Sequence, residues 1–163
     1  MNQNQFAEGA KVLPILAPID AVATARASSY VDLKESLWAQ FHVAFGVITT
    51  GSATVTVEAS TAGSSNATEA AIPFKYRLSG AAGTDTLGAI TSATSAGASI
   101  TAGDDAKLLI IDVDPAALPA NPGDDFSWLR VVVSPTTDMT VCLVGANAVL
   151  QPRYPGNAIN SSS

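Results

Sequence analysis

Short runs of alternating apolar and polar residues recur along this chain, and the clearest run covers residues 37–48. A period of two sends one set of side chains to a buried sheet face and the other set to a solvated face. The run therefore predicts a β-strand, with Trp38, Gln40 and His42 on its solvated side. The set expected in the core comprises Leu37, Ala39, Phe41, Val43, Phe45 and Val47.

Two more strands are predicted in the first half of the chain. Residues 53–60 alternate after the turn residues 49–52, so they are predicted to pair with residues 37–48 as a hairpin. The third strand is predicted over residues 71–78. The core residues expected from the second strand are Ala53, Val55, Val57 and Ala59.

The second half of the chain continues in the same manner. Strands are predicted at residues 88–93, 98–102, 107–113, 128–134 and 139–150, and one short helix at 114–119. Gly-Asp and Pro-Gly-Asp turns separate them. About eight strands with frequent turns predict an all-β fold, an antiparallel β-sandwich of the jelly-roll kind.

The two ends of the chain differ from the body at residues 28–150. Residues 1–27 are expected to form an N-terminal arm or an edge strand, because Pro14 and Pro18 cannot donate to an interior ladder. Residues 151–163 are expected to form a C-terminal tail, and they are rich in proline and serine. Apolar residues on an extended arm need a groove, in the same subunit or in a neighbour.

Composition narrows the choice of partners. The 163 residues carry a formal net charge of −6, and the eight lysines and arginines are scattered singly. Nucleic acid and anionic membranes both require clustered basic residues, so neither is an expected partner. No segment has the length and hydropathy of a signal or a membrane span. The single cysteine, Cys142, is expected to be a small buried hydrophobe.

The residues that could carry chemistry are few. His42 is the only histidine, and its place on the strand favours a surface or interface role. The aspartates at 104–105, 112, 114 and 124–125 lack the spacing of a calcium loop and are better explained as turn residues. No nucleophile elbow, phosphate loop or dinucleotide fingerprint is present. We therefore expect a protein that is not an enzyme, with no catalytic residue, no metal and no cofactor.

Aromatic residues leave one alternative open. Trp38, Trp128, Tyr30 and Tyr76 could stack on a sugar, although aromatic residues in sheets are more often core or interface anchors. A carbohydrate-binding β-sandwich is therefore kept as an alternative function.

The body, from about Leu37 to Tyr154, resembles the capsid decoration, or cement, proteins of tailed bacteriophages. The resemblance lies in three strand-like segments of the first half and three of the second. The segments are Trp38 with Phe41 and Val43, residues 55–60, residues 71–77, Leu108 with Ile110, Val113 and Asp114, residues 128–131, and residues 149–154.

The resemblance implies a structural virion protein on the outer surface of the capsid, made in the host cytoplasm. It would bridge subunits of the major capsid protein and associate with itself as a homodimer or homotrimer. A tail-tube or head–tail joining protein is the other structural alternative. The residues expected at interfaces are Phe6, Val12, Leu13, Ile15, Leu16, Ile19, Arg153 and Tyr154 from the arm and tail, and Trp38, Gln40 and His42 from the exposed sheet face.

Overall fold

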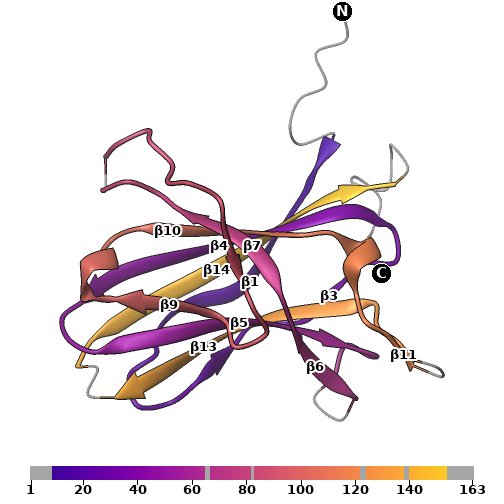
Figure 1. Cartoon of the computed structure of the whole chain (residues 1–163), viewed down its shortest axis with the longest axis horizontal. Coiled ribbons are helices and arrows are strands. Elements are labelled where there is room, and N and C mark those ends of the chain that lie inside the picture. Colours follow the sequence, from indigo (N-terminus) through magenta and orange to yellow (C-terminus); the bar gives the residue numbers. More distant parts are fainter. Residues whose placement is uncertain (1–8, 65–66, 82, 122–123, 138–139, 154–163) are drawn as a thin grey trace, which may run out of the picture.

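The computed structural model describes residues 9–64, 67–81, 83–121, 124–137 and 140–153. Nearly all of its regular structure is β-strand (Figure 1), as the alternating runs predict. The strands are β1 (Lys11–Asp20), β2 (Arg26–Ala27), β3 (Val31–Asp32), β4 (Ser36–Ile48), β5 (Ser52–Ser60), β6 (Glu69–Ile72), β7 (Phe74–Leu78), β8 (Thr91–Ala93), β9 (Ala98–Thr101), β10 (Leu108–Val113), β11 (Ala120–Asn121), β12 (Asp124–Asp125), β13 (Trp128–Thr137) and β14 (Cys142–Pro152). Two single-turn 3-10 helices, η1 (Ala102–Asp104) and η2 (Pro115–Ala117), flank β10.

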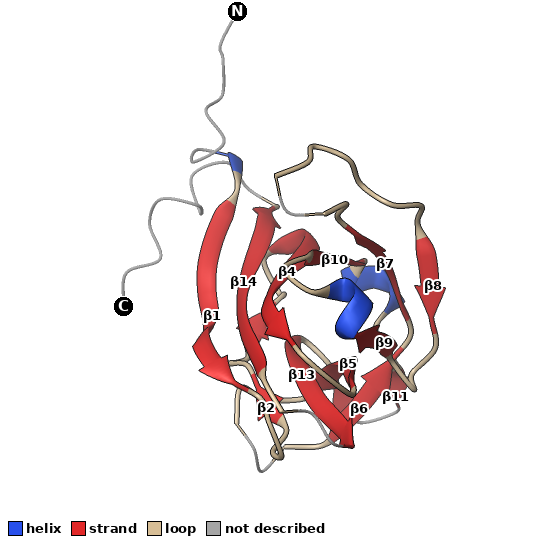
Figure 2. Ribbon diagram, turned by 90° about the vertical axis from the view of Figure 1, so that its left-hand side faces the viewer, coloured by secondary structure: helices blue, strands red, loops and turns tan. Residues whose placement is uncertain are grey.

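Two antiparallel six-stranded sheets form the sandwich. Sheet A has the order β1-β14-β4-β10-β7-β8. Sheet B has β2-β13-β5-β6 along its main path, while β3 also pairs with β13 and β9 with β5. Figure 2 shows sheet A arching from β1 to β8 over the strands of sheet B. The predicted all-β sandwich is thus confirmed.

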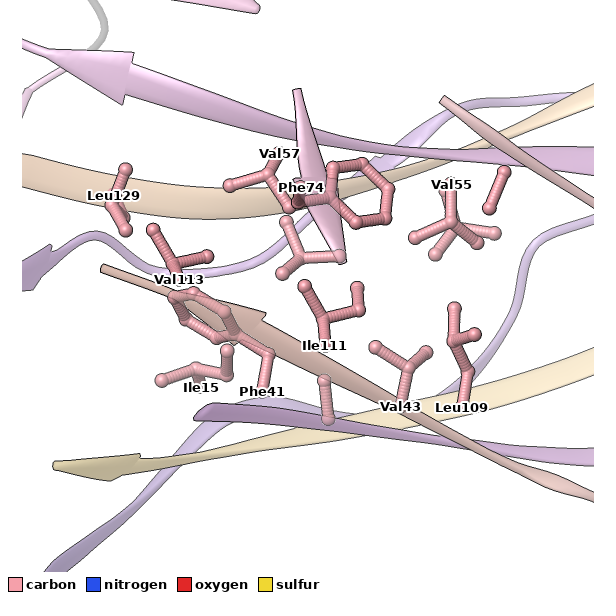
Figure 3. Close-up of a cluster of buried hydrophobic side chains, with 14 of the residues drawn as sticks. Ile15, Phe41, Val43, Val55, Val57, Phe74, Leu109, Ile111, Val113 and Leu129 are labelled. Atoms are coloured by element: carbon pink, nitrogen blue, oxygen red, sulfur yellow. The ribbon is translucent and has the colours of Figure 1, made fainter. Parts of the chain in front are cut away.

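The core lies between the inner faces of these sheets. Phe41, Val43 and Leu109 of sheet A face Val55 and Val57 of sheet B (Figure 3), and all five are fully buried. The four core residues predicted for β5 are buried, and so are Ala39, Phe41, Val43 and Phe45 of β4. Cys142 is also buried, as expected. The two-residue period therefore identifies the inner face of both central strands.

Two core predictions for β4 are wrong, because Leu37 and Val47 are exposed. The ladder between β4 and β14 shifts register between Cys142 and Val144 and again between Gln151 and Pro152. At each shift β4 contributes one extra residue, which breaks the alternation as a β-bulge does. The bulges turn Leu37 and Val47 toward solvent.

The predicted hairpin between residues 37–48 and 53–60 is also wrong. β4 pairs with β10 and β14 in sheet A, whereas β5 pairs with β13, β6 and β9 in sheet B. The turn at Gly51, with a φ of 78°, carries the chain from one sheet to the other. Two consecutive strands with alternating apolar and polar residues can therefore belong to different sheets and pack across the core, instead of pairing in one sheet as a hairpin.

The strand predicted at residues 71–78 is divided at Pro73. β6 ends at Ile72 in sheet B, and β7 begins at Phe74 in sheet A. Proline has no N–H to donate to a ladder, so it is a suitable residue for a strand that changes sheets. Ile72 and Phe74 still both point into the core, as the alternation predicts.

The first strand, β1, is an edge strand of this chain's own sheet A. It pairs along its length with β14, from Lys11 opposite Leu150 to Asp20 opposite Leu143. Ile15 is buried in the core. Pro14 and Pro18 remove two donors from the strand, which discourages further pairing at an edge. Of the two forms expected for this segment, residues 11–20 adopt the edge strand.

Candidate functional site

Exposed hydrophobic side chains gather on sheet A. Among the described residues, eight large hydrophobic side chains are between 36% and 59% exposed. Six of them belong to the three adjacent strands β1, β4 and β14, and two lie between β7 and β8. They are Val12, Ile19, Leu37, Trp38, Val47 and Leu143 on the strands, and Leu87 and Ile90 between β7 and β8. Exposed apolar groups that gather on one surface are typical of interaction sites.

Two of these residues lie together at one end of sheet A, and we call them the distal patch: Val47 and Leu143. Ile19 is at the same end of the sheet, but it lies opposite the buried Val144, whereas Leu143 lies opposite Asp20, so Ile19 is on the other face. Cys142 lies opposite Ile48 in the β14–β4 ladder. The Leu143 Cβ lies 3.0 Å from the position that a Cβ on Gly46 would take. The glycine therefore makes room for Leu143 beside the bulge at Val47.

The interface residues predicted for the arm do not form one surface. Val12 and Ile19 are exposed, while Leu13 and Leu16 are partly buried and pack against the core, and Ile15 is within it. Leu13, Ile15 and Leu16 therefore help to hold β1 on its own sheet. Phe6 and Tyr154 lie outside the described residues. Arg153 is exposed, and its backbone N–H donates to the Glu35 carbonyl at 2.8 Å.

The other predicted interface residues include a polar pair in the middle of sheet A. Gln40 Nε2 donates to Asp112 Oδ1 at 2.7 Å, and the His42 Nε2 atom lies 2.6 Å from Gln40 Oε1. Both side chains are half-buried. Burial lowers the pKa of His42, and the Asp112 carboxylate opposes that shift. A neutral His42 that donates from Nε2 to Gln40 is consistent with this geometry.

Sheet B carries an ion-pair network on its outer face. Arg130 donates from Nε to Glu58 at 2.7 Å and from an η nitrogen to Glu69 at 2.6 Å. Its guanidinium lies 4.9 Å from the centre of the Tyr30 ring, and the Tyr30 hydroxyl donates to Glu69. Burial opposes the charge on Arg130, but the Glu58 hydrogen bond and both carboxylates outweigh it and raise the Arg130 pKa. We therefore interpret Tyr30 and Arg130 as residues that stabilise the fold of sheet B.

The aromatic residues considered for sugar stacking are not brought together. Trp38 lies on β4 and Tyr76 on β7 of sheet A, where Tyr76 packs against the core, whereas Trp128 and Tyr30 lie at sheet B. A Cβ on Gly63 would lie 2.9 Å from the Trp128 ring, so the segment after β5 packs against that indole. Trp38 is the more exposed of the two tryptophans, at 36%, while Trp128 is half-buried.

The described residues contain no group of three or more His, Cys, Asp or Glu side chains that could hold a metal ion. Nor does the described part of the chain include a helix long and apolar enough to cross a membrane. Sequence reasoning missed Val47 and Leu143 as exposed residues. Gly46, inside a strand, was the signal that could have indicated the bulge beside them.

Comparison with known proteins gives little. No protein-family model matches the chain, and no curated protein matches it. Two solved structures match, "Structure of infectious bursal disease virus Gt strain", at 14% identity and a TM-score of 0.23, and the corresponding Gx strain structure, at 15% and 0.21. Each alignment covers 88% of this chain and 41% of the other, so this chain spans less than half the length of either. Similarity at this level carries no argument about function.

Proposed function

We propose that this chain is a structural protein of a virion that decorates a bacteriophage capsid and stabilises it by bridging major capsid protein subunits. It acts on the outer capsid surface after synthesis in the host cytoplasm, associates with itself, and makes or breaks no bond. The segments that resemble decoration proteins motivate the virion setting. The contact surface is the outer face of sheet A.

One observation carries this proposal: six of the eight large hydrophobic side chains exposed in the described part of the chain lie on three adjacent strands of one sheet. Burying the exposed part of these side chains in a protein contact is favourable by about 25 cal/mol per Å² of apolar surface. Many copies on one shell would make such modest contacts collectively strong. The net charge of −6 keeps the unbound protein soluble until it meets its partner.

Binding to capsids tests the proposal. Purified full-length protein is added to expanded bacteriophage heads assembled without it, and bound protein is measured after sedimentation. We expect saturable binding and a higher temperature of head disruption. An absence of binding at saturating concentration contradicts the proposal.

The distal patch supplies the variants. Val47→Asp with Leu143→Asp places two charges on exposed positions of sheet A, and we expect it to weaken binding at least tenfold. The matched control, Thr54→Asp with Thr56→Asp, places two charges on half-buried outer positions of sheet B and is expected to bind normally. Equal binding by both variants would exclude sheet A as the contact surface.

Native mass spectrometry separates this function from its structural alternative. A dimer or trimer in solution is expected of a decoration protein. A closed ring of six or more copies would instead favour a tail-tube or head–tail joining role.

A further inference from the structure

A groove opens at the end of sheet A opposite the distal patch. Its volume is about 670 Å³. Its lining residues come from the beginning of β4, the beginning of β7 and the end of β10. Ten residues of β4 separate Trp38 in the groove from Ile48 at the patch, which corresponds to about 33 Å of strand. The groove is therefore distant from the distal patch, although Leu37 and Trp38 also belong to the exposed hydrophobic residues of sheet A.

The apolar side of the groove is formed around Trp38. The bulge at Leu37 leaves both Leu37 and Trp38 exposed on consecutive positions. Phe74 and Val113 are buried, and their apolar side chains also line the groove. An exposed indole next to a fixed apolar floor offers a flat surface on which a ring with C–H groups can stack.

The polar side of the groove carries both acceptors and donors. Asp112 is held by Gln40 at 2.7 Å, and Asp114 accepts from the Ala116 N–H at 2.9 Å. Each of these bonds uses Oδ1 and fixes a carboxylate in place. Lys75 pairs in register with Asp112, and Ser92 with Lys75, and both line the groove. Hydrogen-bonding groups of both kinds thus line the same groove as the indole.

We propose that this groove binds a neutral saccharide. A pyranose ring offers C–H groups to an indole and hydroxyls that both donate and accept, which matches Trp38 and the four polar side chains. Two carboxylates against one ammonium make the groove unfavourable for an acidic ligand. A purely apolar peptide would cover both carboxylates and offer no hydrogen bond to their second oxygens. This binding is a second property, and it does not rest on the proposed capsid contact.

The experiment uses the two tryptophans of the chain to isolate the groove. Trp128→Phe leaves Trp38 as the only tryptophan. Glucose, galactose, N-acetylglucosamine and their β-linked tetrasaccharides are titrated into this variant. We expect at least one to shift the Trp38 emission with saturation in the millimolar range, and sialic acid to give no such shift. Calorimetry on the unmodified protein should give the same affinity.

Side-chain variants test the contacts. We expect Trp38→Ala to remove calorimetric binding and Asp112→Asn or Asp114→Asn to weaken it roughly tenfold. Asp85→Asn, on an exposed carboxylate outside the groove, is the matched control and should bind as the unmodified protein does. Val47→Asp with Leu143→Asp should also leave saccharide binding unchanged, so that failure here and failure of the capsid proposal are distinguishable.

Three results would overturn the proposal. One is that none of the saccharides binds at millimolar concentration while the protein is folded. Another is that Trp38→Ala binds as tightly as the unmodified protein. The third is that the Trp38 emission depends on protein concentration without sugar, because a second copy would then occupy the groove.

Discussion

The outer faces of sheets A and B differ far more than their inner faces. Both inner faces are valine-, leucine- and alanine-rich, and their side chains are almost entirely buried. Outside, sheet B presents threonines and the Arg130 network, whereas sheet A presents the exposed hydrophobic residues and the groove at Trp38. The hydrophobic residues common to both inner faces determine the sandwich fold. The residues that differ between the two outer faces determine what each sheet can contact.

Deletion of β1 is expected to have the largest effect among the tests of this difference between inner and outer faces. Deletion of residues 1–20 exposes the side of β14 and removes Ile15 from the core. We expect the truncated chain to lose cooperative unfolding, measured by circular dichroism during denaturation. A stable, cooperative fold after the deletion would show that β1 is an arm that the sandwich does not need.

A pair of substitutions on β1 separates its two faces. Ile15→Asp buries a charge in the core and is expected to prevent folding. Val12→Asp, on the exposed side of the same strand, is expected to change the free energy of unfolding by no more than about 0.5 kcal/mol. Similar losses from both variants would contradict the assignment of inner and outer faces.

Among the described residues, Phe41 is the largest fully buried side chain, and it tests the shared core. Phe41→Ala is expected to lower the free energy of unfolding by about 3–5 kcal/mol, through lost burial and the cavity that remains. Guanidinium denaturation measures this change. Leu37→Ala on the same strand is the control, with an expected change below about 1 kcal/mol because Leu37 is 53% exposed.

The Arg130 network tests the outer face of sheet B. Arg130→Met leaves Glu58 and Glu69 without their cation, and all three side chains are only 17–26% exposed. We expect a loss of about 1–3 kcal/mol in stability, with no change in capsid binding. A double-mutant cycle with Glu58→Gln isolates the coupling between the two residues. A coupling close to zero would show that the network is ordered but not stabilising.

Much of the fold could be predicted from the sequence, because the two-residue period is a local property. It identified Ala39 to Phe45 of β4 and Ala53 to Ala59 of β5 as core segments. It could not assign those strands to different sheets, because pairing depends on contacts distant in the sequence. Nor could it locate the bulges at Leu37 and Val47, which depend on the partner strand β14.

The candidate sites were less predictable than the fold. Trp38 and Val12 were expected at an interface from the pattern alone, and both are exposed. The groove escaped sequence reasoning, because its lining residues come from β4, β7, β8 and β10, strands that are adjacent only in the folded sheet. Sites assembled across a ladder have no continuous signature along the chain.

The smallest expected effect concerns the polar strip of sheet A, and it depends on pH. Burial lowers the pKa of His42 in the folded protein, so the unfolded chain binds a proton more readily near pH 6.5. Stability contributed by the neutral ring is present above the unfolded pKa and is lost as the pH falls toward the folded value. We therefore expect the free energy of unfolding to decrease from about pH 7.5 to about pH 5.5, and His42→Gln to flatten that decrease. Because His42 is the only histidine, a slope that is unchanged in the variant would show that the ring is not buried as described.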